Sequence, residues 1–259
     1  MKRMSRTFLF LVLALIVAGC KPEKSIPVSP STQMAPEAYP GEPAKWRVLR
    51  ENMVANQIER RGVHDPKVIA AMRKVPRQLF VPESFREDSY DDNPLPIGSD
   101  QTISQPYIVA KMTELMNLKG GESVLEIGTG SGYQAAVLAE IALVVYTIEI
   151  IPELGLSAEK RLKEIGYKNI LVRVGDGYKG WPEFAPFDSI IVTAAPPFVP
   201  QPLKDQIRVG GRLVLPVGET FQELIVVTRT QTGYDTVKSL PVRFVPMTGE
   251  VQNKIPESP

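Results

Sequence analysis

The sequence predicts an α/β fold in which a doubly wound, mostly parallel sheet follows a set of N-terminal helices and ends in an antiparallel hairpin. Beyond residue 120, short β-rich runs alternate with helical segments, a pattern typical of parallel sheets that bind ligands at the carboxyl ends of their strands. Apolar residues recur at helical spacing in residues 44–61, which indicates the helices. Two β-rich runs near the C-terminus flank a short turn, which indicates the hairpin.

The beginning of the chain has the three parts of a bacterial lipoprotein signal. Basic residues precede an apolar run at residues 8–17, and small residues lead up to Cys20. We therefore expect residues 1–19 to be a signal peptide and Cys20 to be acylated, so that the protein is anchored to a membrane and faces the periplasm. The apolar run is too short to span a bilayer, which needs about 20 residues. A plain secretory signal or a misassigned start is the alternative.

Residues 20–43 are expected to be a tether, because they contain six prolines and no apolar period. Residues 44–250 are expected to form one catalytic domain, and residues 251–259 a tail. The net charge of +1 for 259 residues provides no long-range attraction to nucleic acid, so we expect no nucleic-acid partner. We expect contact with a membrane only through the lipid anchor, and a monomer.

Two helices are expected before the sheet. The first covers residues 44–61, and the second covers residues 66–74 with Asp65 as its N-cap. His64 is the only histidine and Cys20 the only cysteine. A structural role is expected for His64, because one His and one Cys cannot form a zinc site of the usual kind. Catalysis by a serine and histidine pair is poorly supported for the same reason.

The elements of the sheet follow in order along the chain. The expected parallel strands are residues 123–127, 144–149, 169–174, 189–193 and 212–217. Helices are expected after Gly132 and near residues 152–165 and 201–207. The expected antiparallel hairpin consists of residues 223–230 and 234–245.

The first strand-to-helix turn has the strongest motif. Residues 126–133 read Glu-Ile-Gly-Thr-Gly-Ser-Gly-Tyr, and such glycines allow a backbone to approach a ligand beside the amide donors of a helix. Tyr133 occupies the position where a dinucleotide fingerprint requires glycine. The motif resembles that of Rossmann-like S-adenosylmethionine methyltransferases. This resemblance implies that Glu126, Gly128, Gly130 and Gly132 bind S-adenosylmethionine as the cofactor.

Two further sites on successive elements support a nucleotide-like cofactor. Glu149 ends the second strand, where a carboxylate can accept both ribose hydroxyls. Asp176 and Gly177 follow the third strand, where Asp176 is expected to meet the adenine amine. A single glycine-rich turn is often only a packing device, but the ordered set favours cofactor binding.

The segment after the fourth strand argues against an amine as methyl acceptor. Residues 193–198 read Thr-Ala-Ala-Pro-Pro-Phe, and amine methyltransferases of this fold often have a polar residue before the two prolines. Ala195 stands at that position and cannot accept a hydrogen bond through its side chain.

A more specific resemblance covers nearly the whole body, from about residue 53 to 245. Residues 101–107 read Gln-Thr-Ile-Ser-Gln-Pro-Tyr, and shorter matches follow the same order at residues 71–77, 79–82, 95–98, 175–177, 191–195, 215–218 and 242–246. Together they resemble the protein-L-isoaspartate O-methyltransferase family. The chain departs from the family at Ser99-Asp100, where bacterial members commonly have His-Gly, and at Ile150, where an arginine is usual. The leader also departs, because the family is typically cytosolic, so a cytoplasmic location is the alternative.

The resemblance implies methyl transfer from S-adenosylmethionine to the free α-carboxylate of L-isoaspartyl residues in damaged proteins or peptides, which initiates their repair. A carboxylate is ionised near neutral pH, so this reaction needs no general base. Thr102 and Ser104 are expected to orient the isoaspartyl group as catalytic residues. The alternative is that they form a capping turn before a helix that starts near Tyr107.

The expected substrate groove contains Ile103, Gln105, Ala195, Pro196 and Gln222, with the backbone of residues 195–199 free to pair with an extended peptide. Two other functions remain open, and a third is disfavoured. A small-molecule carboxyl O-methyltransferase is the nearest, and a lipid-anchored binding protein with a decayed catalytic body is the non-enzymatic one. A nicotinamide oxidoreductase is disfavoured by Tyr133.

Overall fold

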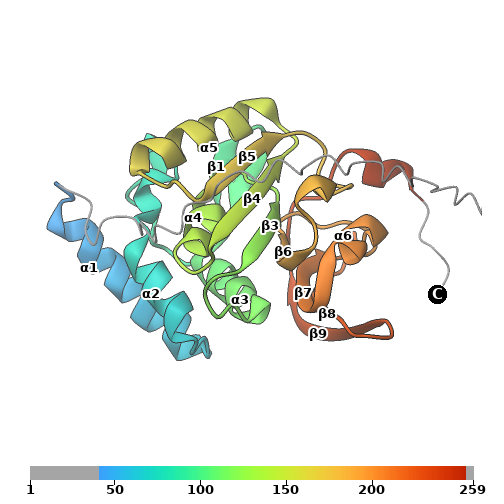
Figure 1. Cartoon of the computed structure of the whole chain (residues 1–259). Helices are drawn as coiled ribbons and strands as arrows, with labels where there is room; N and C mark the ends of the chain where they lie inside the picture. Colours follow the sequence, from blue (N-terminus) through green and yellow to red (C-terminus); the bar gives the residue numbers. More distant parts are fainter. Residues whose placement is uncertain (1–40, 255–259) are drawn as a thin grey trace, which may run out of the picture. The chain divides into compact units, whose positions relative to one another are not determined.

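A seven-stranded sheet lies at the centre of the computed structural model, which describes residues 41–254 (Figure 1). The strand order is β5-β4-β3-β6-β7-β8-β9. The strands are β3 (Ser123–Ile127), β4 (Val144–Glu149), β5 (Ile170–Val174), β6 (Phe187–Val192), β7 (Ile207–Val217), β8 (Gln222–Arg229) and β9 (Tyr234–Val242). The first five pair in parallel, and β8 is antiparallel to both β7 and β9. The predicted mostly parallel sheet with its C-terminal hairpin is confirmed.

The sheet divides the core into two clusters, one on each face. Successive residues of a strand point to opposite faces, so Val124 belongs to one cluster and Leu125 to the other. The first cluster joins the sheet to the helices α1 (Ala44–Met53), α2 (Pro66–Lys74), α3 (Pro106–Met116), α4 (Tyr133–Ala139) and α5 (Pro152–Ile165). The second joins the opposite face to α6 (Gln201–Asp205) and to the C-terminal turn η6 (Glu250–Asn253). Both faces of the central strands are thus buried, as their continuous apolar sequences require.

The N-terminal helices follow the sequence prediction in extent. The predicted helix of residues 44–61 begins as α1, continues as the π-helical η1 (Val54–Ile58) and ends in the 3-10 turn η2 (Glu59–Arg61). Asp65 caps α2 by accepting a hydrogen bond from the Lys67 amide at 2.8 Å, which confirms the predicted cap. The His64 side chain is exposed, and its backbone amide donates to Glu114 Oε1 at 2.6 Å.

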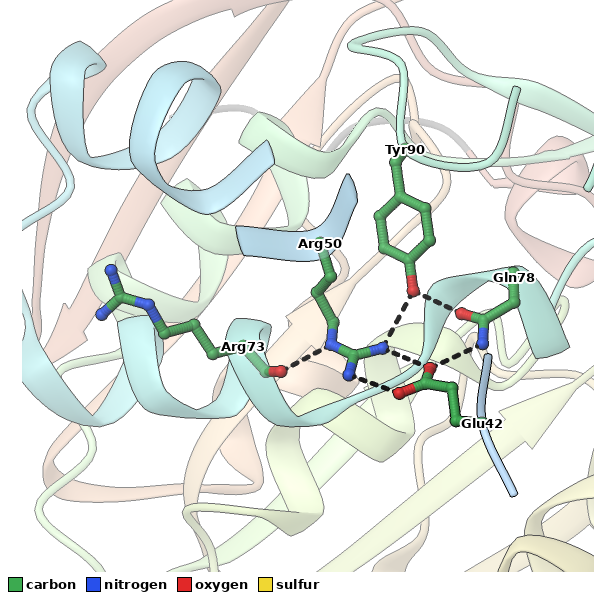
Figure 2. Close-up of polar contacts among 5 residues, drawn as sticks. All are labelled: Glu42, Arg50, Arg73, Gln78 and Tyr90. Carbon is green, nitrogen blue, oxygen red and sulfur yellow. Dashed lines mark hydrogen bonds and ion pairs between the residues drawn. The ribbon is translucent and has the colours of Figure 1, made fainter. Parts of the chain in front are cut away.

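The first residues described already belong to the folded body. Arg50 is buried and forms a two-pronged ion pair with Glu42, at 2.7 and 2.9 Å (Figure 2). Glu42 also accepts a hydrogen bond from Gln78 Nε2 at 2.8 Å, and Tyr90 and the Arg73 carbonyl oxygen complete the contacts of Arg50. Residues 1–40, with the predicted signal peptide, Cys20 and most of the predicted tether, lie outside the described residues.

Several boundaries differ from the prediction. α6 ends at Asp205 rather than at residue 207, and β7 starts at Ile207 rather than at 212. β9 ends at Val242, so residues 243–245 leave the sheet. Val251, which was predicted to start the tail, is fully buried in the second cluster. The folded body therefore reaches η6.

A two-stranded sheet was not predicted. β1 (Leu95–Gly98) and β2 (Gln101–Ile103) pair antiparallel through a turn in which Ser99 and Asp100 have φ of 50° and 55°. Two successive positive φ angles are typical of a type I′ hairpin turn, and this turn allows the two short strands to pair. The remaining 3-10 turns are η3 (Arg77–Leu79), η4 (Glu83–Phe85) and η5 (Pro182–Phe184). None of the helices in residues 41–254 combines the length and apolar character needed to cross a bilayer.

Candidate active site

A cleft opens at the carboxyl ends of β3, β4 and β6, where a parallel sheet of this type binds its ligands. It encloses about 910 Å³, including the part open to solvent. Its lining comes from several regions of the chain: residues 101–104, Val109 and Met112 of α3, most of the glycine turn 127–134, residues 148–151, Gly177 after β5, residues 193–194 after β6, and residues 245–248.

The three glycines of the motif have different roles. Gly128 and Gly130 line the cleft with φ of 99° and 52°, and a Cβ on Gly128 would lie 2.3 Å from Thr193 Oγ1. Gly132 does not line the cleft. It precedes α4 with φ of 86°, and a Cβ there would meet Leu162 of α5 at 3.2 Å. Gly132 was predicted to bind the cofactor, but in the structure it permits the close packing of α4 and α5.

Glu149 lies where the cofactor prediction placed it. Its carboxylate lines the cleft and is almost completely buried. It accepts hydrogen bonds from the amides of Gly130 at 2.7 Å and Ile151 at 3.0 Å. A carboxylate has about four lone-pair positions, so Glu149 can accept two further hydrogen bonds from a vicinal diol while it holds the glycine turn in place.

Glu126 is not in the cleft lining. It is fully buried within β3, and neither of its carboxylate oxygens has a hydrogen-bond partner. Burial raises the pKa of Glu126 to about 8, and the nearby charge of Glu149 acts in the same direction. Glu126 therefore carries a proton at neutral pH, and its predicted contact with the cofactor is not seen, because it is absent from the lining.

Of the predicted pair Asp176 and Gly177, only one residue lines the cleft. Gly177 lines the cleft, and a Cβ there would lie 2.4 Å from Ile127 Cγ2, so only glycine fits. Asp176 does not line it. Its two oxygens accept hydrogen bonds from the amides of Tyr178 at 2.8 Å and Glu250 at 2.6 Å. Asp176, predicted to meet adenine, instead holds the C-terminal turn η6.

The segment 101–104 forms one wall of the cleft. Thr102, Ile103 and Ser104 all line it, as does Gln101. Gln105, predicted to lie in the substrate groove, does not: its side-chain amide donates to Asp92 Oδ2 at 2.9 Å. Gln105 occupies the N-cap position of α3, where no side chain makes a capping hydrogen bond. The alternative interpretation of Thr102 and Ser104 as helix-capping residues therefore has no support in this structure.

The expected peptide groove at residues 195–199 needs correction. Ala195 donates its amide hydrogen to the Val245 carbonyl and accepts from the Met247 amide, both at 2.8 Å, and the Pro196 carbonyl accepts from Gly218 at 3.0 Å. The prediction of a free backbone is wrong at these two residues, because two other segments of the chain form hydrogen bonds with it. Neither Ala195 nor Pro196 lines the cleft, whereas Ala194 does.

Gln222 also lies outside the cleft lining. Its side-chain amide donates to the Phe244 carbonyl at 3.0 Å and accepts from the Phe244 amide at 2.6 Å. It thereby holds the start of residues 245–248, which line the cleft and were missed as site residues. Residues 245 and 246 belong to the stretch 242–246 that resembles the family, so the sequence contained a signal that could have identified them as site residues. Thr129, Ser131 and Thr193 were also missed, although all lie within or beside matched stretches.

The lining suits S-adenosylmethionine. Glu149 is the only Asp, Glu, Lys, Arg or His in the described lining, and its carboxylate contacts the backbone of the glycine turn. Gly177 and the side chains of Ile127 and Ile148 provide an apolar surface for a base. A glycine-lined backbone, one carboxylate for a ribose diol and an apolar wall are the features that an adenosyl group requires. Within residues 41–254, the lining has no imidazole, amine or thiol for acid–base or nucleophilic catalysis.

Comparison with known proteins identifies the same chemistry. The family model described as Protein-L-isoaspartate(D-aspartate) O-methyltransferase matches residues 48–252. The curated protein-L-isoaspartate O-methyltransferase of Picosynechococcus sp. is 56% identical over 201 residues, which cover 78% of this chain and 90% of that protein.

Two solved structures share the fold. A protein-L-isoaspartate O-methyltransferase is 29% identical with a TM-score of 0.73, over 78% of this chain and 67% of that one. A Plasmodium falciparum beta-aspartate methyltransferase in complex with S-adenosyl-L-homocysteine is 26% identical with a TM-score of 0.68, over 78% of this chain and 98% of that one. The chain therefore belongs to the protein-L-isoaspartate(D-aspartate) O-methyltransferase family and is a methyltransferase that uses S-adenosylmethionine.

Proposed function

We propose that this enzyme methylates the free α-carboxylate of L-isoaspartyl residues in damaged proteins or peptides and so initiates their repair. The observation that carries the proposal is that Thr102 and Ser104 line the same cleft as Gly128, Gly130 and Glu149. The glycine turn and Glu149 suit the methyl donor, and the two hydroxyls stand on another wall of the same cleft. Acceptor and donor can therefore meet in one space.

The chemistry of the lining fits a carboxylate acceptor. A carboxylate has a reference pKa near 4 and is ionised at neutral pH, so it attacks without a general base. When bound, S-adenosylmethionine supplies a methyl group on a positively charged sulfur, and that charge is lost on transfer. Thr102 and Ser104 donate hydrogen bonds that orient the acceptor, Glu149 and the glycine turn hold the donor, and the apolar lining excludes water.

The decisive test compares two peptides of the same sequence, one with L-isoaspartate and one with aspartate. Purified residues 41–259 should methylate the isoaspartyl peptide and leave the aspartyl peptide almost untouched, measured as transfer of a labelled methyl group. Equal rates on both peptides would exclude the proposed specificity. A small-molecule carboxyl methyltransferase would modify neither peptide, and a decayed binding protein would bind S-adenosylhomocysteine without transferring a methyl group. Neither alternative is supported by the relatives.

We further propose that the enzyme is a lipoprotein anchored at Cys20 and facing the periplasm. The support is the order of basic, apolar and small residues ahead of Cys20 and the proline-rich stretch after it. A cytoplasmic enzyme is the alternative, favoured by the usual location of S-adenosylmethionine.

A further inference from the structure

The segment that carries Thr102 and Ser104 has limited backbone support. It belongs to the pair β1–β2, which is separate from the seven-stranded sheet and is joined through three residue pairs, Leu95 with Ile103, Pro96 with Thr102, and Gly98 with Gln101. An isolated two-stranded hairpin is marginally stable in water. The position of this segment against the glycine turn therefore depends on side-chain contacts.

One carboxylate makes such contacts at the open end of the hairpin. Asp92 precedes β1, and Gln105 follows β2, so the two face each other beyond the last backbone pair. Gln105 Nε2 donates to Asp92 Oδ2 at 2.9 Å, and Arg61 forms an ion pair with the same oxygen. The Arg61 guanidinium in turn lies 3.5 Å from the centre of the Tyr107 ring. We call Arg61, Asp92, Gln105 and Tyr107 the Asp92 clamp.

The backbone that leads to Asp92 is itself held by buried side chains. The Ser89 carbonyl accepts a hydrogen bond at 2.7 Å from Nε of Arg77, which is fully buried. The Tyr90 carbonyl accepts one at 2.9 Å from Gln57 Nε2. The second carboxylate oxygen of Asp92 is buried and makes no hydrogen bond. Asp92 is thus held against the N-terminal helices, and its hydrogen bond with Gln105 restrains the position of Gln105 in turn.

We propose that Asp92 is a positioning residue for methyl transfer, which acts through Gln105 to hold Thr102 and Ser104 at the correct place in the cleft. This inference rests on the proposed function, and it adds a residue that does not line the cleft. Misplacement of reacting groups by about 1 Å can cost a hundredfold in rate. The clamp therefore controls catalysis without touching either substrate.

The test compares Asp92→Ala with Asp91→Ala, an exposed neighbour outside the clamp. Asp92→Ala should lower kcat/KM for the isoaspartyl peptide by roughly tenfold or more, while calorimetry finds the affinity for S-adenosylhomocysteine largely unchanged. Asp91→Ala should leave both unchanged. Asp92→Asn can still accept from Gln105 and should recover most of the activity. Gln105→Ala should reproduce the loss, and the double variant should be no worse than the stronger single one.

Amide hydrogen exchange of residues 101–105 provides a second readout that does not need activity. Exchange should be faster in Asp92→Ala than in the wild type and unchanged in Asp91→Ala. If Asp92→Ala does not fold, the kinetics and the hydrogen exchange are measured on Gln105→Ala instead, because that variant leaves the ion pair of Arg61 and Asp92 intact. Unchanged exchange, unchanged kinetics, or an equal loss of S-adenosylhomocysteine affinity would overturn the positioning role. A wild-type enzyme that is inactive on the isoaspartyl peptide would overturn the proposed function instead, and the exchange result would still decide the role of Asp92.

Discussion

Ser104 and Thr102 show how a common residue type can acquire a specific role by position. Serine and threonine beside proline are frequent in exposed turns for reasons of local hydrogen bonding. Here both residues line the same cleft as the glycine turn. Their hydroxyls can therefore reach a ligand that the glycine turn also touches.

Ser104→Ala should slow methyl transfer to the isoaspartyl peptide and leave S-adenosylhomocysteine binding intact. Loss of one hydrogen bond to a charged group costs about 1.5–3 kcal/mol, which corresponds to roughly 10- to 100-fold in rate. Steady-state kinetics and calorimetry measure the two quantities, with Ser239→Ala on the exposed face of β9 as the control. A methylated Ser104 that forms during turnover would show that the residue is a nucleophile and not an orienting group.

Glu126 is a residue whose burial has a consequence for stability. Its folded pKa is about 8 against an ordinary value of 4.5, because burial disfavours the charged carboxylate. Between these two values the folded chain holds a proton that the unfolded chain releases. Stability from this residue therefore falls as pH rises through this window.

Glu126→Gln should remove this contribution, because the amide is neutral at every pH. Urea unfolding at several pH values from 5 to 8 should then show a smaller decline of the unfolding free energy for the variant than for the wild type. The difference between the two curves reports Glu126 and cancels the other titrating groups. Parallel curves would mean that Glu126 is ionised in the folded protein.

At the scale of elements, the contacts of Arg50 with Glu42 and Tyr90 show that the folded body begins before α1. Although burial acts to lower the pKa of Arg50, the Glu42 carboxylate and the Tyr90 hydroxyl raise it above its ordinary value. Glu42 lies within the proline-rich stretch that predicts a tether, yet its side chain is about 90% buried. It contacts Arg50 and Gln78 (Figure 2). The ion pair ties this end of the stretch to α1 and to the segment around Tyr90.

A chain that begins at Ala44 should be less stable than one that begins at Gly41. Removal of one partner of a buried ion pair leaves an unpaired charge and costs about 3–5 kcal/mol. Urea unfolding of the two chains measures the difference. Glu42→Gln in the longer chain keeps hydrogen-bonding atoms and should have a smaller effect. Equal stability of the two chains would show that water replaces Glu42 without cost.

At the scale of the whole molecule, the catalytic body and the leader have conflicting implications. The body needs S-adenosylmethionine, which is made in the cytosol, whereas the leader resembles one that directs export and acylation. Acyl chains would hold the body at a membrane surface, because each buried methylene contributes about 0.8 kcal/mol.

The wild-type protein should therefore incorporate labelled palmitate and sediment with membranes, and Cys20→Ala should do neither. Fractionation after metabolic labelling measures both properties in the same cells. A wild-type protein that remains unlabelled, uncleaved and in the cytosolic fraction would assign the enzyme to the usual location of its family.

The sequence by itself determined the fold class, the cofactor and the three short stretches that form most of the site. Alternating β-rich and helical runs are local patterns, and the glycine turn, Glu149 and residues 101–104 each lie within one short stretch of chain. The glycine turn and Glu149 could be predicted to meet because the carboxyl ends of parallel strands lie at one edge of a sheet, whereas residues 101–104 lie outside that sheet and were predicted from the family resemblance.

The tertiary structure decided which of the predicted residues face the cleft. Asp176 binds the amide of Glu250, which is 74 positions away, and Ala195 pairs with Val245 and Met247. Glu126 lies in a central strand with both faces covered, so it is fully buried and does not line the cleft. Hydrogen-bonding groups take the partners that folding brings nearest, and when those partners come from distant parts of the chain, only the assembled structure can show which groups remain for a ligand.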